Sequence, residues 1–71
     1  MTIAEQLRKE GIEEGIRKDI QEILNEQLGN VPQDLNDKLA DIHNVDALRR
    51  LLRAALHAES ADDFRRHLRG I

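Results

Sequence analysis

The first 28 residues have the spacing of one long amphipathic helix, and this feature most constrains the fold. Apolar residues recur there mostly at steps of three and four, which is the period of a helix. Thr2 and Glu5 form a capping box at its start. Gly29 favours the left-handed end of a helix, and Pro32 prevents simple continuation. We therefore expect a helix from Thr2 to Leu28. Its apolar residues are Ile3, Leu7, Ile12, Ile16, Ile20, Ile23, Leu24 and Leu28.

Three shorter helices are predicted for the rest of the chain. Pro32 suits a first helical position and opens a helix that runs to Asp41. Asn44 and Ser60 are good N-caps for the two that follow, Val45–Ala58 and Ala61–Arg69. No segment alternates with period two over the length of a strand. We expect an all-α fold in which a long helix, residues 1–29, precedes a compact unit of three short helices, residues 30–71.

The long helix is predicted to pair with a second copy. Three short helices can cover one another, which leaves the apolar stripe of the long helix exposed, and large exposed apolar patches mark association surfaces. Gly11 and Gly15 share a face and would allow a second helix to approach closely, although a weak or frayed helix tolerates such glycines as well. Folding back into a four-helix unit is the alternative to a homodimer. The predicted interface comprises Ile3, Leu7, Gly11, Ile12, Gly15, Ile16, Ile20, Ile23 and Leu24.

No pattern of catalytic or metal-binding residues is evident. The chain has no cysteine, so thiolate chemistry is excluded. Its two hydroxyl residues, Thr2 and Ser60, stand at predicted caps. The three histidines, His43, His57 and His67, lack the spacing of a metal motif. We therefore expect a protein that is not an enzyme and has no cofactor and no metal.

Charge is distributed unevenly along the chain. Residues 1–48 carry eleven acids and five bases, whereas residues 49–71 carry three acids and six arginines. These arginines are candidate contacts for a polyanion, against the simpler interpretation of a solvated face or of pairing with the acidic first helix. Lysines and aromatic side chains are missing around them, so we do not expect nucleic acid as a direct partner. A small DNA-binding regulator is nevertheless an alternative. The candidates are Arg49, Arg50, Arg53, Arg65, Arg66 and Arg69.

No apolar run approaches the length of a membrane span, and no signal peptide opens the chain. We expect a cytoplasmic protein without a membrane partner.

The opening residues resemble the C-terminal tail of a bacterial nuclease family. Residues 1–15, with the repeated pairs Glu10-Gly11 and Glu14-Gly15, are similar to the tail of the Rpn family of recombination-promoting nucleases. The later leucine-rich segments resemble the helical domain that often ends such proteins, so the resemblance covers essentially the whole chain. The nuclease domain of the family is absent from this sequence. None of the three lysines follows an acidic residue by two positions, so no D/E-x-K half-motif exists.

The resemblance implies a partner and a role. In the Rpn family, short products that begin at an internal start within the tail act as antitoxins, because they bind the full-length nuclease and block DNA cleavage. A chain that opens with Met1 at this point is what such a product is expected to look like, and a longer protein cut at this boundary would look the same. The expected function is therefore a dimerising, protein-binding module that inhibits its parent nuclease. A plain oligomerisation tail is the alternative.

Overall fold

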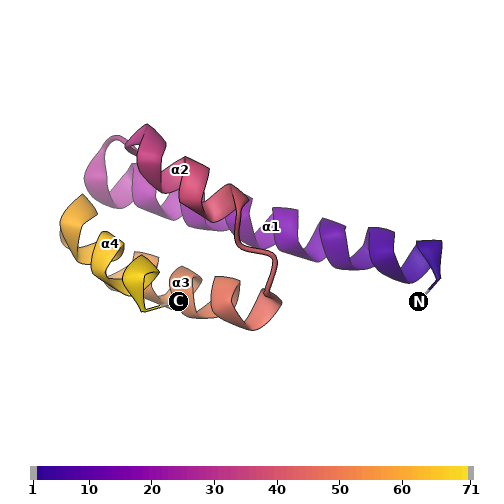
Figure 1. Cartoon of the computed structure of the whole chain (residues 1–71). Helices are drawn as coiled ribbons and strands as arrows, with labels where there is room; N and C mark the ends of the chain where they lie inside the picture. Colours follow the sequence, from indigo (N-terminus) through magenta and orange to yellow (C-terminus); the bar gives the residue numbers. More distant parts are fainter. Residues whose placement is uncertain (1, 71) are drawn as a thin grey trace.

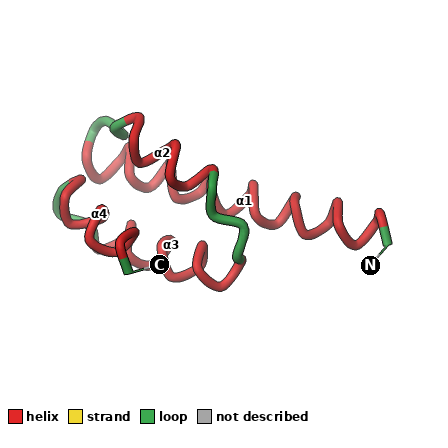
Figure 2. The backbone as a smooth tube through the Cα atoms, in the orientation of Figure 1, coloured by secondary structure: helices red, strands yellow, loops and turns green. Residues whose placement is uncertain are grey.

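A computed structural model describes residues 2–70, and all regular structure in that range is helical (Figures 1 and 2). The first element, α1, spans Ile3–Leu28. The Thr2 hydroxyl accepts a hydrogen bond from the Glu5 amide at 3.2 Å, and the Glu5 carboxylate accepts one from the Thr2 amide at 3.4 Å. At the other end Gly29 adopts a φ of 77°, the left-handed conformation that glycine reaches without steric cost. Both predicted ends of the long helix are confirmed.

Three short helices follow: α2 (Gln33–Ala40), α3 (Val45–His57) and α4 (Ala61–Arg69). Side chains cap the last two, since Asn44 accepts from the Ala47 amide at 3.1 Å and Ser60 accepts from the Asp63 amide at 3.1 Å. Pro32 has an extended ψ of 142°, so it precedes α2 instead of forming its first residue as predicted. The all-α class, with its long first helix, is confirmed for residues 2–70.

The core joins the second half of α1 to the three short helices. Ile20 and Leu24 of α1 are fully buried together with apolar residues of every other helix. The predicted boundary at residue 29 therefore falls inside one packed unit, because the short helices need α1 to complete their core. Figure 1 shows α3 running beside this half of α1. The other core residues are Leu35, Leu39, Leu48, Leu51, Ala55, Ala58, Phe64 and Leu68.

The first half of α1 projects away from this unit (Figure 1). Every residue from 3 to 12 is exposed, and we call this segment the α1 arm. The projection makes the molecule 40 Å long but only 22 Å and 19 Å across. Among the described residues, no helix combines the length and the apolar character needed to cross a bilayer.

Candidate interaction surfaces

The exposed apolar side chains of α1 lie on the arm. Ile3 is 78% exposed, Leu7 62% and Ile12 44%. Gly11 and Gly15 are exposed as well, and a Cβ atom added at either one would meet no atom within 4 Å. The space beside both glycines is therefore open along the helix. Five of the predicted interface residues thus remain on the surface of the protomer.

The other four predicted interface residues are covered by the protomer itself. Ile20 and Leu24 are 0% exposed and belong to the core, while Ile16 and Ile23 are partly buried and pack against it. These positions present no free stripe to a second copy. The sequence pattern that suggested pairing for them reflects intramolecular packing, and the surface left for a partner is confined to the arm and Gly15.

The apolar residues of α1 follow two separate lines around the helix. Ile3, Leu7, Gly11 and Gly15 recur at steps of four and form what we call the outer ridge. Ile12, Ile16, Ile20 and Leu24 form a second line that winds into the core. The step from Leu7 to Ile12 is five residues, a turn of about 140° around the axis. The single stripe inferred from the sequence is thus divided, and the outer ridge faces away from the bundle.

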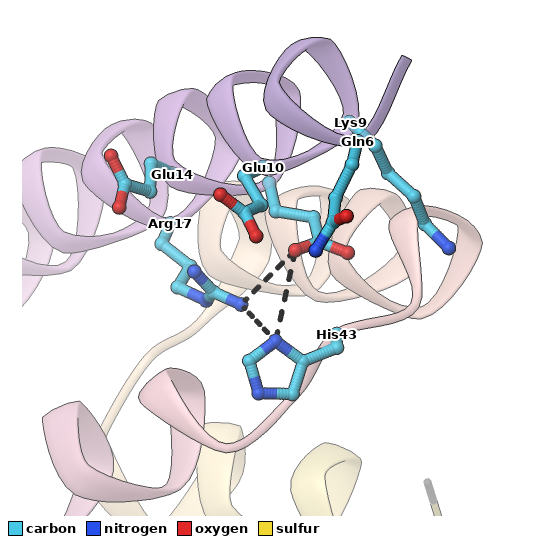
Figure 3. A pocket seen from close by; sticks show the side chains of 7 residues that line it. Gln6, Lys9, Glu10, Glu14, Arg17 and His43 are labelled. Atoms are coloured by element: carbon cyan, nitrogen blue, oxygen red, sulfur yellow. Dashed lines mark hydrogen bonds and ion pairs between the residues drawn. The ribbon is translucent and has the colours of Figure 1, made fainter. Parts of the chain in front are cut away.

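Polar side chains follow the arm along α1, on the face that continues the core. Seven residues are almost two helical turns, so Glu13 stands above Ile20 and Arg17 above Leu24 on the same face. Glu13 is nonetheless only 5% exposed. Its Oε2 lies 3.8 Å from Arg17 Nη2 and 3.7 Å from His43 Nδ1. Figure 3 shows Arg17 and His43 pointing toward one another across this cluster.

Arg17 fastens the end of α2 to α1. Its Nε donates to the Leu39 carbonyl oxygen at 2.9 Å, and its Nη2 donates to the carbonyl oxygen of Ile42. The Leu39 carbonyl also accepts a hydrogen bond from the Ile42 amide at 3.2 Å, so the guanidinium adds a second donor there. Arg17 also contacts His43 Nδ1 at 3.2 Å. Arg17 is therefore a structural anchor between the two helices.

A charged cleft of about 520 Å³ opens beside this anchor (Figure 3). Lys9 and Arg17 contribute two positive charges to its lining, and Glu10, Glu13 and Glu14 contribute three negative ones. Because Arg17 is already bound to the end of α2, the cleft adds an acidic side to the arm. The roles of Glu13, Arg17 and His43 in this cluster were not predicted from the sequence. The signal for Glu13 and Arg17 was the presence of charged residues seven positions before Ile20 and Leu24.

Arg65, one of the candidate polyanion contacts, is bound at the surface by two carboxylates of the same chain. It forms a bidentate pair with Asp34 of α2 at 2.9 and 3.0 Å and contacts Asp62 at 2.6 Å. The hydrogen bond from Arg65 lowers the pKa of the Asp34 carboxyl below its ordinary value of 3.8. The same bond and that to Asp62 raise the pKa of Arg65. Arg65 therefore ties α4 to α2 and is not free to bind a ligand.

The other five candidate arginines are exposed, and the fold brings three of them together. Arg50 and Arg53 of α3 line a hollow with His67 of α4, and Arg50 and Arg66 line the adjacent hollow, which His67 also borders. Arg49 and Arg69 line neither of these hollows. The predicted patch is therefore divided into a clustered group and two separate side chains.

Within residues 2–70, no group of three histidine or acidic side chains is arranged to hold a metal ion. A scan against protein-family models, a search of curated proteins and a search of solved structures each found no match to this chain.

Proposed function

We propose that this chain is a non-catalytic association module that pairs through the α1 arm. The observation that carries the proposal is the arm itself, a helical segment whose isoleucine and leucine side chains are exposed to water. Helices in proteins take most of their stability from packing of an apolar face. Gly11 and Gly15 weaken the segment further, by roughly 1 kcal/mol each relative to alanine. A partner laid along the outer ridge would supply the missing packing.

The outer ridge suits a second helix of the same kind. Its two bulky residues, Ile3 and Leu7, come first, and its two glycines follow at the same four-residue step. Small residues let two helix backbones come close, and bulky ones fill the space where the helices diverge. The bundle lies on the opposite side of α1, so a copy approaching the outer ridge would not meet it. A homodimer formed by two arms is therefore the favoured assembly.

The biological partner we propose is a DNA nuclease that carries the same tail. This step rests on the resemblance of residues 1–15 to the tail of the Rpn family. A short chain with a free arm would compete for the arm of the nuclease and so prevent its subunits from pairing. Inhibition of cleavage would follow from that competition without any chemistry in this chain.

Sedimentation over a concentration series tests the pairing. The parent chain should shift from monomer to dimer as its concentration rises, and Leu7→Asp should remain a monomer because a charge cannot be buried cheaply in an apolar contact. Gln6→Asp places the same charge on the other side of the arm and should leave the dimer intact. A parent chain that stays monomeric throughout, or equal loss of dimer in both variants, would refute the arm as the interface.

The glycines provide a second test with an unusual signature. Gly11→Ala and Gly15→Ala should raise helix content, because neither new methyl group meets an atom in the protomer. The same methyl groups would hold two paired helices apart and weaken the dimer. A chain that becomes more helical and pairs less would support close approach. Stronger pairing in the alanine variants would contradict it.

Inhibition is tested by adding this chain to a full-length nuclease that ends in the same sequence. Cleavage of plasmid DNA should fall as the chain is added, and the Leu7→Asp chain should inhibit far less. Undiminished cleavage, together with no co-elution of the two proteins, would eliminate the antitoxin role. Dimerisation without inhibition would instead identify a plain oligomerisation tail.

A further inference from the structure

Five arginines of the C-terminal half have no side-chain partner within the described part of the chain, and three of these five line adjoining hollows. Arg50, Arg53 and Arg66 are exposed and take part in none of the side-chain hydrogen bonds and ion pairs found in residues 2–70. Arg17 and Arg65, in contrast, make several such bonds each. The fold therefore distinguishes arginines that hold helices together from arginines whose donors remain free.

Arg50, Arg53 and Arg66 line one part of the surface, which we call the α3–α4 groove. It consists of two adjoining hollows of about 370 Å³ and 290 Å³. Both are bordered by Arg50 and His67; Arg53 lines the first hollow and Arg66 the second. Arginines from two different helices thus line adjoining hollows, although the helices are separate in the sequence.

We propose that the α3–α4 groove binds phosphate groups. Three arginines line the two hollows, and the one carboxylate among the lining residues, that of Asp63, borders only the first. One oxygen of that carboxylate, Oδ2, accepts a hydrogen bond from the Glu59 amide at 3.3 Å. The groove therefore carries excess positive charge, which an anion would neutralise.

The positions of the arginines are not explained by the helix dipoles alone. Basic residues in the last turn of a helix offset its partial negative charge. Arg66 stands in the last turn of α4, so this explanation covers it. The last turn of α3 contains His57 as its basic residue, whereas Arg50 and Arg53 lie earlier in that helix. The helix dipole therefore does not account for the positions of Arg50 and Arg53.

Phosphate fits this cluster better than a carboxylate does. One guanidinium satisfies both oxygens of a carboxylate, as the bidentate Arg65–Asp34 pair of this same chain shows. Three guanidinium groups offer more donors than a carboxylate can accept. A phosphate presents more anionic oxygens, and arginine pairs with it in the same forked geometry. The number of free donors is the reason for choosing phosphate over an acidic protein surface.

Base stacking would not contribute to nucleic-acid binding at this groove. Stacking of bases on aromatic platforms requires exposed aromatic side chains. The one aromatic residue of the chain, Phe64, is fully buried in the core. The contacts that the groove offers are those of arginine with phosphate, which nucleic-acid backbones and small phosphate esters share.

The test uses the full chain and two probes, pyrophosphate and a short DNA duplex, with sodium chloride at matched ionic strength as the blank. Amide chemical shifts should change around the α3–α4 groove with pyrophosphate. Arg50→Gln should weaken binding about tenfold, since the loss of one hydrogen bond to a charged group lowers affinity by at least about that factor. Arg49→Gln is the matched control, because its side chain is also exposed but lines neither hollow.

The two probes distinguish the source of the phosphate. Binding of duplex DNA with a salt slope of about −2.7, from about −0.9 for each of three contacts, identifies a nucleic-acid backbone. Binding of pyrophosphate without DNA identifies a small phosphate ester. Binding of neither probe, or equal losses in Arg49→Gln and Arg50→Gln, would overturn the proposal. The Leu7→Asp chain should bind phosphate like the parent, so failure of the pairing model leaves this result interpretable.

Discussion

Replacing Ile20 by valine and Leu7 by aspartate separates the folding role of α1 from its proposed pairing role. Ile20 is fully buried among the core residues. Ile20→Val removes one methyl group from a packed site, which costs about 0.5–1.5 kcal/mol. A single core of this size rarely provides more than about 3–5 kcal/mol in total. The conservative change should therefore remove a substantial fraction of the free energy of unfolding.

Leu7→Asp is a far larger chemical change but should hardly affect folding of the protomer. Leu7 is 62% exposed and lies outside the core. Surface substitutions of this kind alter stability by less than about 0.5 kcal/mol. The expected order of effects is thus opposite to the size of the two substitutions.

Thermal unfolding followed by circular dichroism at low and high protein concentration measures both effects. At low concentration Ile20→Val should lower the midpoint by about 4–8 °C for each kcal/mol lost, whereas Leu7→Asp should match the parent. At high concentration the parent should gain stability from association, and Leu7→Asp should not. A Leu7→Asp chain that melts well below the parent when dilute would show that the arm packs within the protomer, and this would refute the reasoning.

Three other side chains give independent tests. Arg17→Met should destabilise the fold by about 2 kcal/mol in urea titrations, because it removes the hydrogen bonds to the Leu39 and Ile42 carbonyl oxygens and the cation beside the buried Glu13; an unchanged midpoint would contradict the anchor role. Asn36→Leu should raise the free energy of unfolding by about 1 kcal/mol, since the buried Oδ1 of Asn36 has no hydrogen-bond partner; a loss of stability would show that the amide is needed. The lowered pKa of Asp34 means that its pairing stabilises the fold above its ordinary pKa of 3.8 and that this contribution disappears as the pH falls through the folded-state pKa. Urea midpoints between about pH 2.5 and pH 5 should therefore fall less steeply in Asp34→Asn than in the parent, and parallel curves would exclude this contribution.

The ends of the helices were predictable because they depend on neighbouring residues. Thr2, Asn44 and Ser60 each cap through an amide three positions ahead, and Gly29 ends α1 by its own backbone conformation. Interactions of this range are visible in a short window of sequence. The same locality explains why the class of the fold could be inferred without knowing how the helices pack.

The candidate surfaces could be predicted only in part, because they depend on residues distant in sequence. Glu13 and Arg17 have the four-residue spacing of an ordinary ion pair on a helix surface. Their structural role becomes apparent only when the end of α2, more than twenty residues later, lies against them. The clustering of Arg50 with Arg66 depends likewise on how α4 folds back onto α3. Counting arginines identified the candidates but not the division between free and engaged ones.

The separation between core and arm is encoded in α1 itself. The core face of α1 would be extended toward the N-terminus by the positions that lie seven or fourteen residues before Ile20 and Leu24. These positions are Gln6, Glu10, Glu13 and Arg17. Burying these polar groups under longer α2 and α3 helices would be costly without partners for each. The apolar residues Ile3 and Leu7 of the arm instead lie on a different face of α1 from the core residues, because the step from Leu7 to Ile12 is five residues. One helix thus directs its second half toward its own chain and its first half outward, which is the arrangement an association module requires.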